Sequence, residues 1–301
     1  MNSPRIPAWE HGPSPFLFWN TQHFAERGLP PEQPPATLAE AAAYAERLTA
    51  LSPDGQITRL GWEPLTEAGD SLLGYWANAY EVSWYDPQAR RVNLVQPGLL
   101  AALEYLTMVY QRLRLTPERI QDFRRQYPRW NAPQAGMAQG AESMKVSSYV
   151  SAGTLARNAP QQPIAIGWAP AHRPRTFISL GGGWRVSLVS GAAQPEASFR
   201  FMEWLTTPEA NQRILDEIGW IGYNKAVATG LRIDRVPNLR FVLDAPRLAQ
   251  QVLAPVILPV ETEAVNAGVQ RVLAGQQGAR EMLQEATYQL QTALDEALRV
   301  R

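Results

Sequence analysis

The chain has 301 residues, 45% of them hydrophobic, which is enough to build a full core and excludes a globally disordered protein. Its 28 Lys and Arg residues balance 28 Asp and Glu residues, whereas nucleic-acid binding calls for a basic surface, so we expect no nucleic-acid partner. There is no cysteine, the three histidines are scattered, and no apolar run has the length of a membrane helix. The sequence therefore predicts no metal site, no cofactor and no membrane-spanning helix.

Short apolar strands and helices alternate along the first half of the chain. Residues 16–19 (FLFW) are wholly apolar and predict a buried strand, and residues 20–29 predict a short helix that ends near Gly28. Thr37 and Glu40 have the spacing of a capping box at the start of the next helix. The expected elements that follow are a helix over 38–51, a strand and loop over 57–64, a helix over 69–80, a hairpin over 83–95, and helices over 97–115 and 117–128.

The second half continues the same alternation. Residues 136–156 mix a helix start with an apolar strand around Met144–Val146. Further along, the expected elements are strands over 164–170 and 184–189 and helices over 195–207, 208–219, 262–275 and 278–300. Strands that alternate with longer helices indicate an α/β protein in which helices flank the sheets.

Sequence motifs of common enzymes are missing. The chain contains neither a G-x-S-x-G nucleophile elbow nor a G-x-x-x-x-G-K-[ST] phosphate loop. Glu63, Glu67 and Asp70 lie close together in one loop, but a glycoside hydrolase needs two carboxylates that face each other across the scissile bond. For Glu67 and Asp70 an acidic helix start is the simpler interpretation. A glycoside hydrolase that uses Glu63 stays open as an alternative.

Aromatic residues are the most informative feature. The chain has ten Trp and ten Tyr residues, many of them at element ends or in loops rather than on the apolar stripes of helices. An aromatic ring can cover the apolar C–H face of a sugar, so aromatic residues at the mouths of loops suit carbohydrate recognition. The alternative for each ring is that it fills the core. Trp76 and Trp184, which follows the glycine triplet 181–183, are the strongest candidates for stacking.

The order of these signals resembles the extracytoplasmic solute-binding proteins of ABC sugar importers, family 1, of which the maltose-binding protein is the type. The family pattern YN-x-x-x-F-x-x-x-G-L is matched by 19-WNTQHFAERGL-29, and its G-x-x-A-M strand by 140-GAESMKVSSY-149, with Ser143 in place of the alanine. The segment 182-GGWRVSLVSGAAQPEASFRFMEWLTTPEAN-211 matches the family's strand after a glycine pair and its following helices. The C-terminal helices are echoed by residues 266–290.

The resemblance implies an α/β, periplasmic-binding-protein-like type II fold with two lobes, of which the N-terminal lobe is expected to be largely lacking. It implies four ranges: 1–135 as the first part of the C-terminal lobe with an inter-lobe strand at its start, 136–165 as a segment of the N-terminal lobe and a crossover, 166–245 as the second part of the C-terminal lobe, and 246–301 as C-terminal helices. The small residues of the glycine pair would let a ligand approach the backbone beside Trp184.

The implied function is carbohydrate binding without catalysis. The partners would be a sugar or oligosaccharide ligand and the permease subunits of an ABC transporter, and the location would be extracytoplasmic, although residues 1–15 lack the apolar run of a signal peptide. A third possibility is a truncated member of the family that binds nothing. The predicted ligand-binding residues are Trp62, Glu63, Trp76, Tyr149, Gly182, Gly183, Trp184 and Tyr223.

Overall fold

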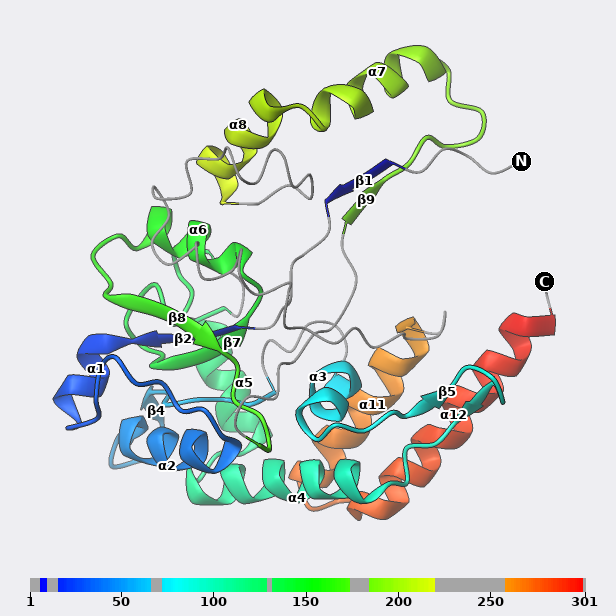
Figure 1. The fold of residues 1–301 in the computed structure, drawn as a ribbon. Coiled ribbons are helices and arrows are strands. Elements are labelled where there is room, and N and C mark those ends of the chain that lie inside the picture. The colour runs from blue at the N-terminus through cyan, green and yellow to red at the C-terminus, as the bar shows by residue number, and fades with distance from the viewer. Residues whose placement is uncertain are drawn as a thin grey trace.

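The structure of the protein is a computed structural model. It describes residues 6–9, 16–65, 72–128, 132–173, 184–219 and 258–299. Figure 1 shows a larger part that contains most of the helices and a smaller part, at the top of the view, that consists of the strands β1 and β9 and the helices α7 and α8.

A three-stranded sheet lies within the larger part. Its central strand is β2 (Phe16–Asn20), which is flanked by β7 (Met144–Ser147) on one side and β8 (Ile164–Trp168) on the other, both antiparallel to β2. All five residues of β2 are buried, and its side chains alternate between two clusters, with Phe16 and Phe18 in one and Leu17 and Trp19 in the other. The apolar run therefore forms a strand that is covered on both faces, as the sequence predicts.

Helices and short hairpins make up the rest of the larger part. Capping signals set several of their boundaries: the hydroxyl of Thr37 accepts a hydrogen bond from the amide of Glu40, whose carboxylate accepts from the amide of Thr37. The helices of the larger part are α1 (Thr21–Glu26), α2 (Leu38–Leu48), α3 (Leu72–Ala79), α4 (Pro97–Arg112), α5 (Pro117–Gln126), α6 (Val150–Asn158), α11 (Leu258–Leu273) and α12 (Ala279–Arg299). The short strands β3 (Ala50–Leu51) and β4 (Ile57–Arg59) form one hairpin, and β5 (Tyr85–Asp86) and β6 (Arg91–Val92) form another.

The smaller part contains β1 (Ile6–Trp9), β9 (Trp184–Val186), α7 (Pro195–Leu205) and α8 (Pro208–Ile218). β1 and β9 pair antiparallel, and α8 ends at Gly219, which has the left-handed backbone that a helix stop favours. Gly219 lies against Gly153 of α6 so closely that a Cβ atom built on either glycine would fall 2.4 Å from the Cα atom of the other. This contact of two glycines joins the smaller part to the larger one.

The elements agree with the sequence-based expectations in most places, but the helix start expected within residues 136–156 does not precede the strand. Residues 136–140 form turns, the strand follows at β7, and the helix α6 begins only at Val150. β7 lies in the range 136–165, which was expected in the N-terminal lobe, whereas β2 lies in 1–135, and the two strands share one sheet. The division into four lobe ranges stays a prediction. None of the helices in the described ranges is both long and apolar enough to cross a membrane.

Candidate functional site

Three chain segments end at the same edge of the central sheet. Because β7 and β8 are both antiparallel to β2, they run in the same direction, and their last residues, Ser147 and Trp168, lie on either side of Phe16. Residues 60–62 run beside β7 in this direction as well, with the amide of Met144 donating to the carbonyl oxygen of Gly61 at 2.9 Å. In open α/β sheets, ligands bind outside the carboxyl ends of the strands. We refer to the edge beside Ser147 and Trp168 as the carboxyl edge.

The turn that follows β7 brings polar groups to the carboxyl edge. The hydroxyls of Ser147 and Ser151 lie 2.7 Å apart and share a hydrogen bond. Tyr149 occupies the N-cap position of α6 but provides no side-chain cap, and the buried Oγ of Ser148 has no hydrogen-bond partner in the described part of the chain. The amides of Ser151 and Ala152 already donate to the carbonyl oxygens of Ser148 and Tyr149, so the hydroxyl of Ser148 is the polar group of this turn that can bind an oxygen-rich ligand.

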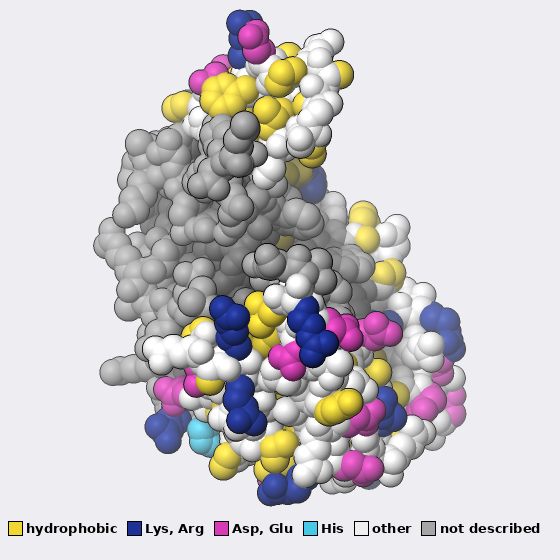
Figure 2. Space-filling view, turned by 90° about the vertical axis from the view of Figure 1, so that its right-hand side faces the viewer, with side chains coloured by type: hydrophobic (Ala, Val, Ile, Leu, Met, Phe, Trp, Pro, Cys, Tyr) yellow, Lys and Arg dark blue, Asp and Glu magenta, His cyan; other side chains and the backbone are white. Residues whose placement is uncertain are grey.

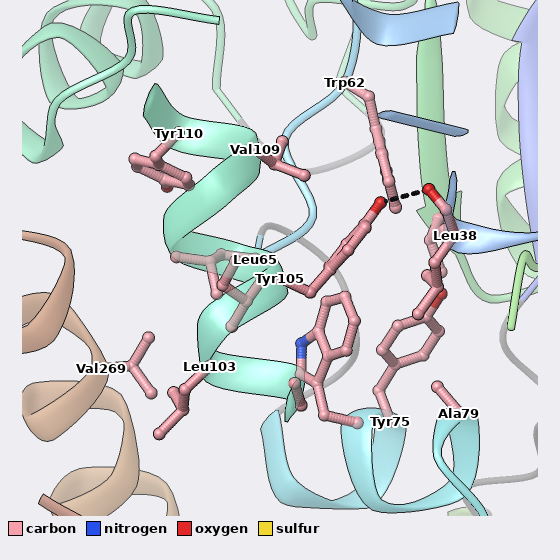
Figure 3. Close-up of a cluster of buried hydrophobic side chains, with 14 of the residues drawn as sticks. Leu38, Trp62, Leu65, Tyr75, Ala79, Leu103, Tyr105, Val109, Tyr110 and Val269 are labelled. Carbon is pink, nitrogen blue, oxygen red and sulfur yellow. Dashed lines mark hydrogen bonds between the residues drawn. The ribbon is translucent and has the colours of Figure 1, made fainter. Parts of the chain in front are cut away.

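A buried aromatic cluster lies beside the segment that leads to this edge (Figure 3). The ring of Tyr105 on α4 lies 6.5 Å from that of Trp62 and 5.7 Å from that of Trp76, centroid to centroid. The hydroxyl of Tyr105 donates to the carbonyl oxygen of Leu38 at 2.7 Å, and burial raises the pKa of this phenol. Among the described residues, the indole Nε1 atoms of Trp62 and Trp76 are buried without an acceptor. Through these ring contacts, the segment around Trp62 packs against α3 and α4.

Glu63 belongs to a buried ion cluster. The guanidinium of Arg124 on α5 donates to Glu63 at 3.1 Å and to Glu142 at 2.7 Å, and the hydroxyl of Tyr110 donates to the other oxygen of Glu63 at 3.1 Å. Burial alone would lower the pKa of Arg124, but the carboxylates of Glu142 and Glu63 outweigh burial and raise it. Glu63, Tyr110 and Arg124 line one wall of a cavity of about 560 Å³, which Gln121 also lines. The ion cluster holds Glu63, which directly follows residues 60–62, against α4 and α5.

The predicted site residues fall into distinct environments. Trp62, Trp76 and Tyr149 are only 1%, 2% and 3% exposed, so none of these rings presents an open face to solvent. Trp62 and Trp76 share the core cluster of α3 and α4, whereas Tyr149 packs with Phe16 in the other cluster. Their roles as ligand contacts remain predictions.

Four of the predicted ligand-binding residues lie outside the part of the chain that the structure describes, or directly at its boundary. Gly182, Gly183 and Tyr223 lie outside the described residues. Trp184 begins β9, where its backbone pairs with that of Trp9. The predicted stacking by Trp184 is therefore an expectation to be tested by substitution.

Sequence reasoning overlooked three residues of this region. Trp168 is the last residue of β8, and its ring lies 5.8 Å from that of Phe16; the sequence gave no signal for it, because the strand was expected to extend to residue 170. Tyr105 lies on the buried stripe of α4 and gave no sign of joining two tryptophans. Arg124 had no signal, because Glu63 and Glu142 are 61 and 18 residues away in the sequence. In the described ranges, no group of three or more His, Asp and Glu side chains is placed to hold a metal ion.

Comparison with known proteins places this architecture in a wider group. No curated protein matches the sequence. Among solved structures, CpMnBP1 with mannobiose bound has a TM-score of 0.79 at 19% identity, over 93% of this chain and 70% of its own. An ABC transporter solute-binding protein from Thermotoga lettingae, bound with α-D-tagatose, has a TM-score of 0.76 at 21% identity, over 95% of this chain and 72% of its own.

A third similar structure is the maltose/maltodextrin-binding domain MalE from Bdellovibrio bacteriovorus bound to maltotriose, with a TM-score of 0.67 at 15% identity, over 97% of this chain and 73% of its own. These similarities confirm the predicted α/β, periplasmic-binding-protein-like fold. The family model of bacterial extracellular solute-binding proteins matches residues 9–239. The chain thus belongs to the bacterial extracellular solute-binding protein family.

Proposed function

We propose that this protein binds a carbohydrate at the carboxyl edge of its central sheet and acts as the substrate-binding component of an ABC importer. The observation that carries the proposal is the family match, which spans both parts of the described fold. The similar structures named above hold mannobiose, α-D-tagatose and maltotriose, all of them sugars, which supports a sugar as the ligand class. The family also supports an extracytoplasmic location.

Connectivity supports the carboxyl edge as the binding position. Along the chain, β1 of the smaller part precedes β2, which begins with Phe16 at this edge, and β9 follows β8, which ends there with Trp168. The two strands of the smaller part are therefore neighbours in the element order of β2 and β8, whose ends lie at this edge. A ligand held there would contact both parts, and their approach on binding would report occupancy to the permease subunits that we propose as partners.

The side chains at this edge suit the two surfaces of a sugar. Tyr149 and Trp168 offer aromatic rings for the apolar ring face, and Trp184 is the predicted stacking residue from the strand β9. The hydroxyl of Ser148, which has no hydrogen-bond partner among the described residues, offers a hydrogen bond for a sugar hydroxyl. Because Tyr149 is buried, a ligand that stacks on it would replace the groups that now cover the ring.

The hydrolase alternative receives less support from the geometry. A glycoside hydrolase needs one carboxyl group that delivers a proton and a second that faces it across the sugar. Glu63 and Glu142 instead share the same guanidinium, and Glu63 also accepts from Tyr110, so both carboxylates are held as ion-pair partners. We propose a binding protein without catalysis, and expect no turnover of chromogenic glycosides under conditions in which binding is measured.

A ligand panel tests the proposal. Mannobiose, tagatose, maltotriose and mannitol should be titrated by calorimetry and by thermal melting, since a ligand at a hundred times its Kd stabilises the folded state by about 2.7 kcal/mol. Tyr149→Leu should weaken binding by about 1–3 kcal/mol, roughly five- to 160-fold. The matched control is Tyr288→Leu, since Tyr288 is 75% exposed on α12.

Three outcomes separate the hypotheses. Binding of at least one sugar that Tyr149→Leu weakens and Tyr288→Leu leaves unchanged supports the proposal. Failure of every polyol and sugar to bind or to raise the melting temperature supports a member of the family that binds nothing. Turnover that Glu63→Gln abolishes supports the hydrolase. Trp184→Ala, measured in the same two assays, decides whether that ring contacts ligand or stabilises the fold.

A further inference from the structure

The helix α8 packs on both parts of the molecule. Its residue Ile214 packs against Leu205 of α7, as does Val186 of β9, and these side chains form a hydrophobic cluster of the smaller part. Leu215, the next residue of α8, is buried in the cluster around α6 and Phe16 in the larger part. Two neighbouring residues of one helix therefore join the packing of β9 to that of α6.

Where α8 meets α6, the contact is made by Gly153 and Gly219, which we call the glycine seam. A Cβ atom built on Gly153 would lie 2.4 Å from the Cα atom of Gly219, 3.1 Å from its amide nitrogen and 3.3 Å from the carbonyl oxygen of Ile218. All three atoms belong to the backbone, which cannot rotate aside as a flexible side chain can. Since the separation of two packed helices depends on the side chains at their contact, a side chain at the glycine seam must push α6 and α8 apart.

The glycine seam lies close to the proposed sugar contacts on α6. Tyr149 precedes Gly153 by four residues and has helical backbone angles, a spacing that places two residues on the same face of a helix. Tyr149 and Leu215 are members of the same buried cluster. The seam therefore holds α8 beside the end of α6 that carries Tyr149 and, directly before it, Ser148.

On its other side, α8 is attached to the elements of the smaller part. The side-chain amide of Asn211 on α8 is buried and donates to the carbonyl oxygen of Leu205 at 2.9 Å, and Leu205 packs against Val186 of β9. β9 begins with Trp184, the predicted stacking residue. Figure 2 shows the described residues of the smaller part at the top of the view and those of the larger part below them. Because close-packed side chains transmit a displacement, a shift of α8 away from α6 moves β9 with it.

We infer that Gly153 and Gly219 are positioning residues of the proposed sugar site. Their contact sets the distance between α6, with Ser148 and Tyr149, and β9, with Trp184. Neither glycine needs to touch the sugar, because each acts by letting α6 and α8 approach closely. The inference rests on the proposed function and adds that sugar affinity is controlled at a helix contact outside the contact residues.

The first measurement needs no ligand. The chain has no cysteine, so spin labels can be attached specifically after Arg157→Cys on α6 and Arg200→Cys on α7, both at exposed positions. Pulsed electron paramagnetic resonance then reports the distance between the labels. Gly153→Ala should lengthen this distance, whereas Gly278→Ala, where the nearest atom is 4.0 Å from the added Cβ, should leave it unchanged.

The second measurement is the affinity for mannobiose and for maltotriose, by calorimetry at a temperature at which circular dichroism shows each variant to be folded. Under this condition a loss of stability alone leaves Kd unchanged, because nearly every molecule is competent to bind. Gly153→Ala should weaken binding of the sugar that the parent binds by about tenfold, the scale of a typical coupling between two sites. Gly278→Ala should bind as the parent does.

A milder variant covers the case in which Gly153→Ala does not fold. Ile214 is half-buried, and Ile214→Ala loosens α8 from Leu205 while the glycine seam stays intact. This variant should broaden the distribution of label distances and weaken sugar binding, for the same reason as Gly153→Ala.

The outcomes separate this inference from the proposed function. A longer or broader label distance together with weaker binding supports the inference. If the parent binds sugar and a folded variant keeps either the parent's distance distribution or the parent's affinity, the positioning role is overturned and the proposed function stands. If the parent binds neither mannobiose nor maltotriose nor any other sugar of the panel, the proposed function fails, and the positioning role fails with it.

Discussion

Replacing Arg124 by methionine should be among the most destabilising single changes in the larger part of the molecule. The Arg124 side chain is 9% exposed and bridges Glu63 and Glu142, each 1% exposed. Methionine fills much of the same volume but leaves both buried carboxylates without their cation. Removing one partner of a buried ion pair costs about 3–5 kcal/mol. Since Arg124 serves two carboxylates, we expect a loss at the upper end of this range, about 4–5 kcal/mol at neutral pH.

The assay is urea unfolding followed by tryptophan fluorescence, with Arg125→Met as the matched control. Arg125 is the next residue on α5, its side chain is 67% exposed, and its pairing with Asp122 is a surface ion pair. Such pairs contribute about 0–1 kcal/mol, so the control should unfold close to the parent. Arg124→Lys should fall between the two, because it keeps the charge but loses the forked geometry that reaches both carboxylates.

The pH dependence provides an independent check on the reason for the loss. Protonation removes the buried charge of a carboxylate, so the difference between Arg124→Met and the parent should shrink as the pH falls toward about 4–5. Combining Arg124→Met with Glu63→Gln and Glu142→Gln should restore part of the lost stability at neutral pH. Equal stability of Arg124→Met and Arg125→Met at pH 7 would refute the argument, as would a loss that does not change with pH.

Four further predictions concern single residues. Gly153→Ala should destabilise strongly and loosen the contact between α6 and α8, because its Cβ would fall 2.4 Å from the Cα of Gly219; Gly278→Ala, where the nearest atom is 4.0 Å away, is the control in the same unfolding assay. Thr37→Ala should cost about 1 kcal/mol by removing the capping box of α2, and an unchanged urea midpoint would contradict this. Trp76→Ala should cost about 3–5 kcal/mol as a core deletion, whereas full stability with lost sugar affinity would assign the ring to the ligand. Burial, together with the charge of Arg59, lowers the pKa of His23 below its ordinary 6.5, so the unfolded chain binds the proton more readily and stability should fall as the pH drops below about 6.5; His23→Gln should flatten this part of the curve, which unfolding at several pH values checks.

Local signals in the sequence were sufficient to predict most of the helices and strands. The apolar run at 16–19 became a strand buried on both faces, and Thr37 and Glu40 became a capping box. Gly219 became the left-handed stop of α8. These features depend on residues a few positions apart, whose backbone preferences and side-chain hydrogen bonds act within a single element. The order of such signals was also enough to indicate the solute-binding family.

The environment of each predicted site residue was decided only by the tertiary structure. The sequence marked Glu63 as a candidate ligand contact, but folding brought Arg124 to it from 61 residues away. The sequence marked Trp62 and Trp76 as aromatics at element ends, but α4 placed Tyr105 between them in the core. Whether an aromatic or charged side chain faces a ligand, another side chain or solvent depends on which distant segments pack beside it. No periodicity or spacing along the chain contains that information, because pairing and packing join residues that are remote in sequence.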